Sequence, residues 1–382
     1  MYDYIIVGSG FAGATAANLL ADRYGKKVLI IEKRSHIGGN CYDEKDEHGI
    51  LIHKYGPHIF HTDSDKVYEY LSQFTKWYDY SHEVVAFVDE DYIPVPFNLN
   101  TLKIAFPDQA EELREKLVDS YGYGNKVPIL ELRNNDDEDI RKIADYVYDN
   151  IFLKYTMKQW GQTPEEINPA VTGRVPILIS DDNRYFQDTY QGMPLNGYTP
   201  IFENMLMGNE NIDIMYDTDC KEVLKFTEEG IIYNNELFTG RVIFTGPIDE
   251  LFDNRFGKLP YRTLNFVSEY LDKDSYQPKA VVNYTVSEDF TRITEYKKLT
   301  GQEASGTSIM KEYPMSYTGD DGQIPYYAII NEENLEIYNK YLDMLSVYDN
   351  FYLLGRLAEY KYYNIDAIVL KSMELVEELE NK

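Results

Sequence analysis

The sequence predicts an α/β protein with a discontinuous Rossmann-like domain, an inserted helical domain and an antiparallel β-sheet domain. A β-α-β pattern at the N-terminus indicates the first domain, and short β-branched runs after residue 210 indicate that the chain returns to it. Helical periodicity over 99–150 and alternating polarity over 260–290 and 305–330 indicate the other two.

The N-terminal unit has a strand, a glycine turn, a helix and a second strand. Tyr4–Val7 is a short apolar run, and Ala14–Tyr24 places alanines and leucines at helical spacing before Gly25. Val28–Ile31 is the second buried strand and ends at Glu32. This order predicts a parallel, doubly wound sheet with a right-handed crossover.

The middle of the chain is predicted to be helical. The polar run Asn134–Asp139 resembles an unstructured segment, but Ile140, Ile143, Ala144 and Val147 follow it at helical period. Asparagine and aspartate favour helix N-caps, and acidic residues favour the first turn. We therefore interpret this run as a capped helix start.

The remaining elements alternate between short strands and helices. Strands are expected at 212–215, 222–224, 231–233, 241–247 and 351–355, and helices at 332–346 and 365–379. The resulting domains are a dinucleotide-binding domain of 1–80, 208–250 and 330–382, a helical domain of 98–185 with a mobile lid at about 161–176, and a sheet domain of 81–97, 186–207 and 251–329.

Composition limits the function. The chain has 382 residues and a formal charge of −28, which disfavours nucleic acid and anionic membranes as partners. An anionic nucleotide ligand therefore requires a local cluster of cations. The two cysteines, Cys41 and Cys220, lack metal-ligand spacing, and no apolar run is long enough to span a membrane, so a cytoplasmic protein without a structural metal is expected.

The glycine turn predicts a dinucleotide site. In Gly8-x-Gly10-x-x-Gly13, the first glycine makes the turn, the second admits a pyrophosphate and the third allows close helix–strand packing. Glu32 lies 19 residues after Gly13, where an acid accepts hydrogen bonds from a ribose diol. The whole constellation is much more specific than the glycines alone.

The residues that follow resemble two known patterns. Lys33-Arg34 followed by Gly38-Gly39 resembles the second fingerprint of FAD enzymes of the glutathione-reductase class, which favours FAD over NAD. The segment Tyr55–Thr62, with His58 and His61 three apart, lacks a carboxylate at metal-ligand spacing and resembles the Gly-Pro-His-x-Phe-His segment of UDP-galactopyranose mutases.

Further segments resemble that mutase family in the same order along almost the whole chain. They are 155–161, 168–176, Tyr185-Phe186, 261–264, 291–295, 324–327 and 355–357. The ordered set is more specific than any one segment.

The resemblance implies an isomerase that interconverts UDP-galactopyranose and UDP-galactofuranose. In that family, N5 of a reduced FAD attacks the anomeric carbon, displaces UDP and allows the sugar to reclose with the other ring size. It also implies an external reductant such as NAD(P)H, a homodimer, and supply of galactofuranose to cell-surface glycans. An FAD-dependent oxidoreductase of the amine-oxidase type remains the alternative.

The same resemblance assigns site residues. Cofactor contacts are expected from Gly8, Gly10, Phe11, Gly13, Glu32, Lys33, Arg34, Gly39, Asn40, His58, Ile59, His61, Val223, Arg262, Gly355, Arg356, Asn364 and Ile365. Catalytic roles are expected for Arg174, Arg292, His58 and Trp160. Substrate contacts are expected from Phe152, Tyr155, Thr156, Gln159, Trp160, Arg174, Tyr185, Arg292, Tyr326, Tyr327, Tyr362 and Asn364.

Two assignments leave alternatives open. Phe152 and Tyr155 resemble a uracil-stacking pair, but their i, i+3 spacing also fits ordinary helix packing. Asn364 stands where the family usually has an aspartate, which keeps hydrogen bonding but removes a charge. This difference leaves the preferred sugar open, including a 2-acetamido sugar, although His58 favours plain galactose.

Overall fold

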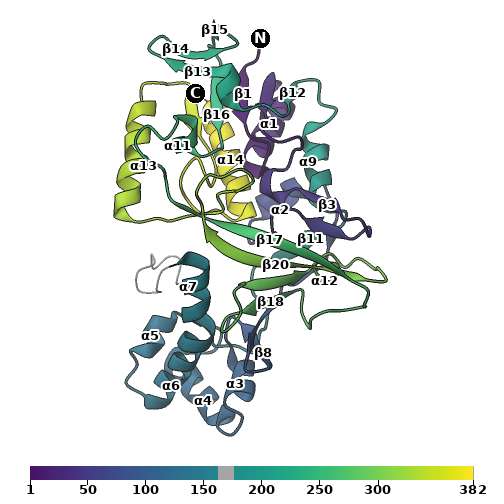
Figure 1. The fold of residues 1–382 in the computed structure, drawn as a ribbon, viewed down its shortest axis with the longest axis vertical. Coiled ribbons are helices and arrows are strands. Elements are labelled where there is room, and N and C mark those ends of the chain that lie inside the picture. The colour runs from purple at the N-terminus through teal and green to yellow at the C-terminus, as the bar shows by residue number, and fades with distance from the viewer. Residues whose placement is uncertain (162–175, 382) are drawn as a thin grey trace.

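The structure is a computed structural model that describes residues 1–161 and 176–381. The longest dimension contains three layers in sequence: a parallel sheet with its helices, a large twisted sheet, and a helical domain at the far end (Figure 1). The N- and C-terminal segments lie together in the first layer. No helix within the described residues is long and apolar enough to cross a membrane.

The first layer is built on a five-stranded sheet in the order β12-β2-β1-β16-β22. All neighbours are parallel: β1 (Tyr4–Val7), β2 (Val28–Ile31), β12 (Ile212–Met215), β16 (Arg241–Phe244) and β22 (Phe351–Leu353). The sheet collects strands from the two ends and the middle of the chain, and this confirms that the domain is discontinuous.

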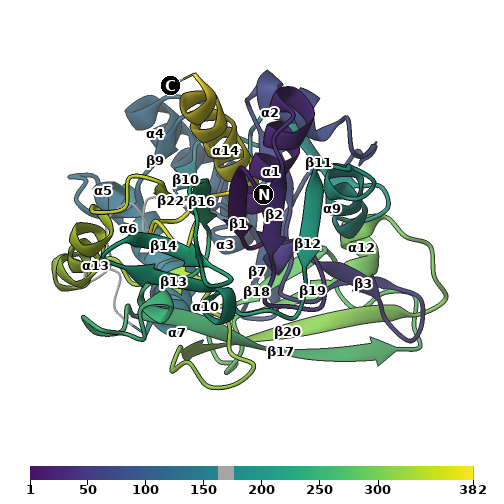
Figure 2. The same ribbon diagram turned by 90° about the horizontal axis from the view of Figure 1, so that it is seen from above.

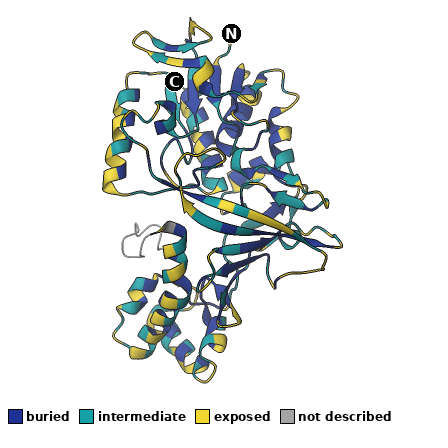
Figure 3. Ribbon diagram, viewed as in Figure 1, coloured by how far each residue is buried: buried dark blue, intermediate teal, exposed yellow. Residues whose placement is uncertain are grey.

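Helices α1 (Phe11–Tyr24) and α14 (Ile365–Glu380) pack side by side against this sheet (Figure 2). Their contact is close because the alanines of α1 are almost fully buried, including Ala14, Ala16 and Ala17 at 0% exposure. Many residues of this layer are buried, whereas exposed residues lie on its outer helices, such as α13 (Glu332–Leu345) (Figure 3). The N- and C-terminal segments thus share one core.

The second layer is a seven-stranded sheet in the order β21-β17-β20-β19-β18-β7-β8. Its longest strands, β17 (Tyr261–Leu271) and β20 (Thr307–Ser316), run antiparallel across the middle of the molecule (Figure 1). Strands β18 (Val281–Tyr284) and β7 (Val84–Val88) form its one parallel pair among the described residues. The antiparallel sheet domain is therefore present, with one parallel pair next to its edge strand β8 (Asp91–Val95).

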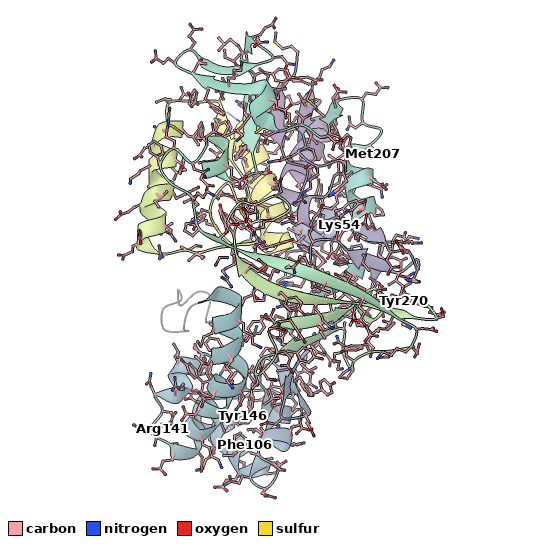
Figure 4. The ribbon with its side chains drawn as sticks, in the orientation of Figure 1. Lys54, Phe106, Arg141, Tyr146, Met207 and Tyr270 are labelled. Atoms are coloured by element: carbon pink, nitrogen blue, oxygen red, sulfur yellow. The ribbon has the colours of Figure 1, made fainter. Side chains whose placement is uncertain are left out.

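The third layer contains α3 (Leu99–Ala105), α4 (Ala110–Tyr121), α5 (Ile129–Arg133), α6 (Glu138–Val147) and α7 (Lys154–Trp160). The Asp137 carboxylate caps α6 by accepting from the N–H groups of Asp139 and Ile140, which confirms the predicted helix start. Phe106 and Tyr146 meet edge to face with ring centroids 5.3 Å apart (Figure 4).

Two predictions about elements are wrong. Segment 186–207 was assigned to the sheet domain, but β11 (Tyr190–Pro194) pairs with β5 (Phe60–Thr62) and β6 (Trp77–Tyr78) of the first layer. Helix α9 (Thr199–Leu206) packs on α1, with the rings of Phe202 and Phe11 4.7 Å apart.

The strand expected at 222–224 is mostly the short helix α10 (Cys220–Val223). The Asp219 side chain accepts a hydrogen bond from the Lys221 N–H and starts this turn. A β-branched residue such as Val223 favours strands, but the local cap outweighs that preference.

Other elements complete the chain. They are β3 (Asp43–Lys45), β4 (Leu51–His53), α2 (Asp65–Leu71), β8 (Asp91–Val95), β9 (Lys126–Val127), β10 (Ile177–Leu178), β13 (Leu224–Thr227), β14 (Gly230–Tyr233), β15 (Glu236–Leu237), α11 (Ile248–Leu251), β19 (Arg292–Glu295), α12 (Tyr296–Thr300), β21 (Tyr327–Ala328), α13 (Glu332–Leu345), a 3₁₀ turn (Gly39–Cys41) and a π-helical segment (Tyr148–Leu153).

Candidate active site

The glycine turn has the tight geometry that its spacing predicts. Gly8 has φ +96°, and a Cβ atom there would lie 2.2 Å from Thr245 Oγ1. A Cβ atom on Gly13 would lie 2.0 Å from the Gly8 carbonyl oxygen, so helix α1 can approach β1 only with glycine at this position. Gly10 is the N-cap of α1 and offers no side-chain cap. The first N–H groups of α1 are thus left for an anion.

Glu32 closes the turn from the next strand. Its side chain is buried at 5% exposure and accepts from the Ser9 N–H at 2.9 Å and the Ser9 hydroxyl at 2.5 Å. The Arg34 N–H donates to its other oxygen at 2.9 Å. Carboxylate oxygens have further lone pairs, so Glu32 can hold the turn and still accept from a ribose diol.

The segment that resembles the second FAD fingerprint, 33–39, lies against the glycine turn of 8–13. Gly39 has φ +56°, and a Cβ atom there would lie 2.9 Å from Gly10 Cα. Arg34 donates from Nη2 to Asn40 Oδ1 at 2.9 Å and places its guanidinium 4.2 Å from the Tyr55 ring centre. Its buried Nη1 has no partner among the described residues, which makes it an available donor.

A cavity of about 1010 Å³ extends from this turn. Its lining includes most of the predicted cofactor residues: Gly8, Gly10, Phe11, Glu32, Lys33, Arg34, Gly39, Asn40, His58, Gly355, Arg356, Asn364 and Ile365. The uncapped helix start, the buried acid and the free Arg34 donor together fit the pyrophosphate and ribose of a flavin dinucleotide.

A smaller cavity of about 270 Å³ adjoins it. The predicted residues in its lining are His58, Ile59, His61, Phe152, Tyr155, Thr156, Gln159, Tyr185, Arg292, Tyr327, Arg356, Tyr362, Asn364 and Ile365. Four of these, His58, Arg356, Asn364 and Ile365, also line the larger cavity. The two cavities therefore meet at these four side chains.

Arg292 is the most firmly held cation of the smaller cavity. Its Nη2 donates to the Tyr155 hydroxyl at 2.5 Å, and its Nε lies 3.5 Å from an oxygen of Glu312. Glu312 is buried at 2% exposure, and burial raises its pKa while the Arg292 guanidinium opposes that rise. Arg292 remains charged because guanidinium is not deprotonated in proteins.

His58 and His82, which line the smaller cavity, are neutral. Burial, followed by the charges of His53 and Arg356, lowers the pKa of His58 to about 3. Burial and the Arg292 charge likewise lower the pKa of His82 to about 3. His82, with Asn283 and Phe186, lines the smaller cavity but was not assigned to the site from sequence. A histidine two residues before a strand shows no distinguishing spacing.

Some predicted cofactor residues lie elsewhere. Val223 packs in the core beneath the parallel sheet and lines neither cavity. Gly13 acts through helix packing alone, and Ile59 and His61 line only the smaller cavity. His61 stacks on Phe186 with ring centroids 3.6 Å apart and lies 3.1 Å from Asp188.

Arg262 and Tyr326 also lie outside both cavities. Arg262 donates to the carbonyl oxygens of Gln159 at 2.9 Å and Lys158 at 3.1 Å, so it ties the end of α7 to β17. Tyr326 packs edge to face on Phe266. Both side chains have structural contacts, and their ligand contacts stay predictions.

The positions of Phe152 and Tyr155 are compatible with both alternatives, and the stacking role stays a prediction. Phe152 is 8% exposed and belongs to the core of the helical domain, yet it also lines the smaller cavity beside Tyr155. The side chain of Trp160 and all of Arg174 lie outside the described residues. Within the described part of the chain, no three metal-ligating side chains cluster.

The parallel sheet, the uncapped glycine turn and the two joined cavities define a Rossmann-like nucleotide-binding protein with a second ligand pocket. A family model for an NAD(P)-binding Rossmann-like domain matches residues 6–74. A family model for UDP-galactopyranose mutase matches residues 150–362, and the chain belongs to this family of flavoprotein isomerases.

Individual relatives agree with the family match. A dTDP-fucopyranose mutase of Escherichia coli is 36% identical over 98% of this chain and 97% of its own. A UDP-galactopyranose mutase of Mycoplasma genitalium is 36% identical over 99% of this chain and 95% of its own. A solved structure of reduced UDP-galactopyranose mutase superposes with TM-score 0.73 at 16% identity, covering 100% of this chain and 94% of its own, and supports the fold.

The family match decides between the two enzyme classes that the sequence left open. The chain is an isomerase, and the amine-oxidase-type alternative is not supported. The shared nucleotide-binding domain explains why that alternative arose, because the glycine turn and its acid are common to both classes.

Proposed function

We propose that this chain interconverts UDP-galactopyranose and UDP-galactofuranose, with FAD in the larger cavity and the nucleotide sugar in the smaller one. The observation that supports this best is the junction of the cavities at His58, Arg356, Asn364 and Ile365. A cofactor and a sugar in these cavities would meet there.

Charge in the smaller cavity supports an anionic substrate. The chain carries −28 overall, yet the described lining contains Arg292 and Arg356 and no carboxylate. Guanidinium groups grip phosphate oxygens bidentately, so these two arginines suit a diphosphate. When bound and reduced, FAD supplies the nucleophilic N5 that the family chemistry requires.

The other side chains have defined tasks in this proposal. Phe152 and Tyr155 stack the nucleobase, and Thr156 and Gln159 read its polar edge. Gln159 Oε1 is buried without a partner among the described residues, so it is available as an acceptor. Arg292 stabilises the negative charge of the leaving UDP, because its two protein partners fix it before the reaction.

Several assignments are proposed from the sequence resemblance alone. We keep Arg174 as a second diphosphate contact and Trp160 as a neighbour of the sugar. An external reductant such as NAD(P)H, a homodimer and a role in cell-surface glycan supply complete the proposal.

A thymidine diphosphate sugar is the second candidate substrate. The fucopyranose mutase relative is as similar to this chain as the galactopyranose mutase relative is. Val84, Val95, Ile151 and Val281 line the smaller cavity and form an apolar wall that suits a methyl group. Thymine and a 6-deoxy sugar each carry such a methyl group.

The test is product analysis with flavin-loaded protein and chemical reductant. UDP-galactofuranose should convert to UDP-galactopyranose without stoichiometric use of reductant, and oxidised protein should be inactive. Parallel reactions with the dTDP-fucose isomers distinguish the candidates by kcat/KM. Equal turnover by oxidised protein would contradict the mechanism, and failure of all four substrates would contradict the function.

A further inference from the structure

His53 is buried at the end of β4, and a short turn of the chain connects it to His58 at the junction of the two cavities. Its side chain is 1% exposed and lines neither cavity. Its ring packs against Tyr198 and Tyr296, with ring centroids 5.5 Å away in each case. The sequence resemblance assigned no role to this residue.

The His53 side chain closes the turn that leads to His58. The backbone N–H of His58 donates to His53 Nδ1 at 3.0 Å. Because Nδ1 accepts this bond, it carries no proton, and the proton of the neutral ring is on Nε2. Burial lowers the pKa of His53 to about 3, which keeps the ring in this acceptor form.

Two further bonds complete the turn. The Gly56 N–H donates to the His53 carbonyl at 3.4 Å, and His58 Nδ1 lies 2.9 Å from the Gly56 carbonyl. Gly56 has φ +94°, and a Cβ atom there would lie 3.0 Å from Phe266 Cζ, so the turn has little freedom to shift. A neutral His58 whose Nδ1 donates to that carbonyl has Nε2 free as an acceptor.

We propose that His53 is a positioning residue, which holds the His58 backbone through Nδ1 and so fixes the His58 ring where the cofactor and substrate cavities meet. His53 acts through His58 and touches neither ligand. The inference rests on the proposed function in one respect: the larger cavity must hold a flavin.

The matched variants differ in where they place an acceptor. In His53→Asn, the amide oxygen replaces Nδ1. In His53→Gln, the amide oxygen reaches the position of Nε2 instead. His53→Leu fills the site without an acceptor, and His48→Leu makes the same change at an exposed position of the same hairpin.

Each flavin-loaded variant is measured for the midpoint potential and visible spectrum of the flavin, and for kcat and KM. We expect His53→Leu and His53→Gln to shift the flavin potential and spectrum and to lower kcat about tenfold or more, with KM changed less than about threefold. Loss of a bond that leaves the part-buried His58 N–H unpaired is large enough for this effect. His53→Asn should restore both readouts, and His48→Leu should match the parent protein.

A purely structural role would lower thermal stability in Asn and Gln variants alike and leave the flavin potential unchanged. Equal behaviour of His53→Asn and His53→Gln in potential, spectrum and kcat would therefore overturn the inference. If His53→Leu does not retain flavin, the Asn–Gln comparison still decides. The potential and spectrum require no sugar nucleotide, so they decide the role of His53 even if the proposed substrate is wrong.

Discussion

At the scale of single residues, Arg292 is the side chain whose surroundings best define a task. It is fixed by the Tyr155 hydroxyl and by buried Glu312, and it faces a cavity without carboxylates among the described residues. Arg292→Ala should raise the activation free energy by about 2–5 kcal/mol, which lowers kcat/KM roughly 30- to 5,000-fold. Steady-state kinetics with bound flavin measures this. Arg292→Lys should recover only part of the loss because it lacks the bidentate fork.

A surface arginine outside both cavities provides the control for Arg292. Arg114 makes two bonds to Asp181, at 2.6 and 2.7 Å, on the surface of the helical domain. Exposed ion pairs contribute about 0–1 kcal/mol to stability, and this pair is remote from both cavities. Arg114→Ala should retain normal turnover. Normal turnover by Arg292→Ala would remove Arg292 from the diphosphate site.

The arginines also show where sequence reasoning at this scale ends. Arg262 and Arg292 both belong to segments that resemble the family, yet Arg292 lines the cavity and Arg262 binds two backbone carbonyls of α7. The position of a residue in a family motif predicts which strand carries it and that this strand is near the site. Which way a long side chain extends depends on partners from distant segments, here Gln159 and Glu312, and single-sequence patterns do not contain that information.

At the scale of elements, α3 is joined to the loop between β10 and β11. Asn98 is its N-cap, is fully buried and accepts from the Asn100 N–H at 3.0 Å. Its Nδ2 donates to the Asp182 carbonyl at 3.0 Å and to Asn183 Oδ1 at 2.9 Å. Asn98→Ala removes the cap and these bonds, so it should lower the free energy of unfolding by about 2–3 kcal/mol. Thermal melting at fixed flavin concentration measures the loss.

A second cap gives the matched comparison. Asn331 caps α13 by accepting from the Asn334 N–H at 2.8 Å, but it is exposed. Asn331→Ala should cost only about 1 kcal/mol, the usual value of a cap. If the two variants lose equal stability, the bonds of Asn98 to the 182–183 loop contribute nothing beyond capping.

Helices and strands that depend on local sequence signals were predicted well. The runs Tyr4–Val7 and Val28–Ile31 form strands, and the Asp137 start of α6 is confirmed, because periodicity and caps act within a few residues. The placement of 186–207 was wrong because it depends on pairing with strands more than 100 residues earlier, as in the Tyr190–Thr62 pair. Such pairing leaves no pattern in the segment itself.

At the scale of the whole molecule, a chain with a net charge of −28 contains a smaller cavity whose described lining has arginines and no carboxylate. A requirement for local cations followed from the charge alone. The sequence did not predict that the two cavities join at His58, Arg356, Asn364 and Ile365, because these residues come from two distant segments that only the fold brings together.

The buried titratable groups give the molecule a definite response to acid. His53, His58 and His82 each have a pKa lowered to about 3 by burial, against about 6.5 in the unfolded chain. A histidine with a depressed pKa stabilises the fold above pH 6.5, and that contribution is lost as the pH falls toward 3. Burial raises the pKa of Asp249 to about 6, so this carboxyl acts in the opposite direction and stabilises the fold as the pH falls below 6.

The three histidines should therefore make stability decline on acidification from about pH 6.5, while Asp249, Asp43 and Glu312, whose pKa values burial raises, oppose part of that decline. Each histidine contributes a slope of about 1.4 kcal/mol per pH unit. His82→Asn isolates one of them, since its amide oxygen can still accept from the Tyr80 hydroxyl, which lies 3.0 Å from His82 Nδ1. The variant should lose stability less steeply than the parent between pH 6 and 4, by about that one-proton slope. Denaturant unfolding at fixed flavin concentration across this range measures both slopes, and parallel curves for the two proteins would mean that His82 is not buried in its neutral form.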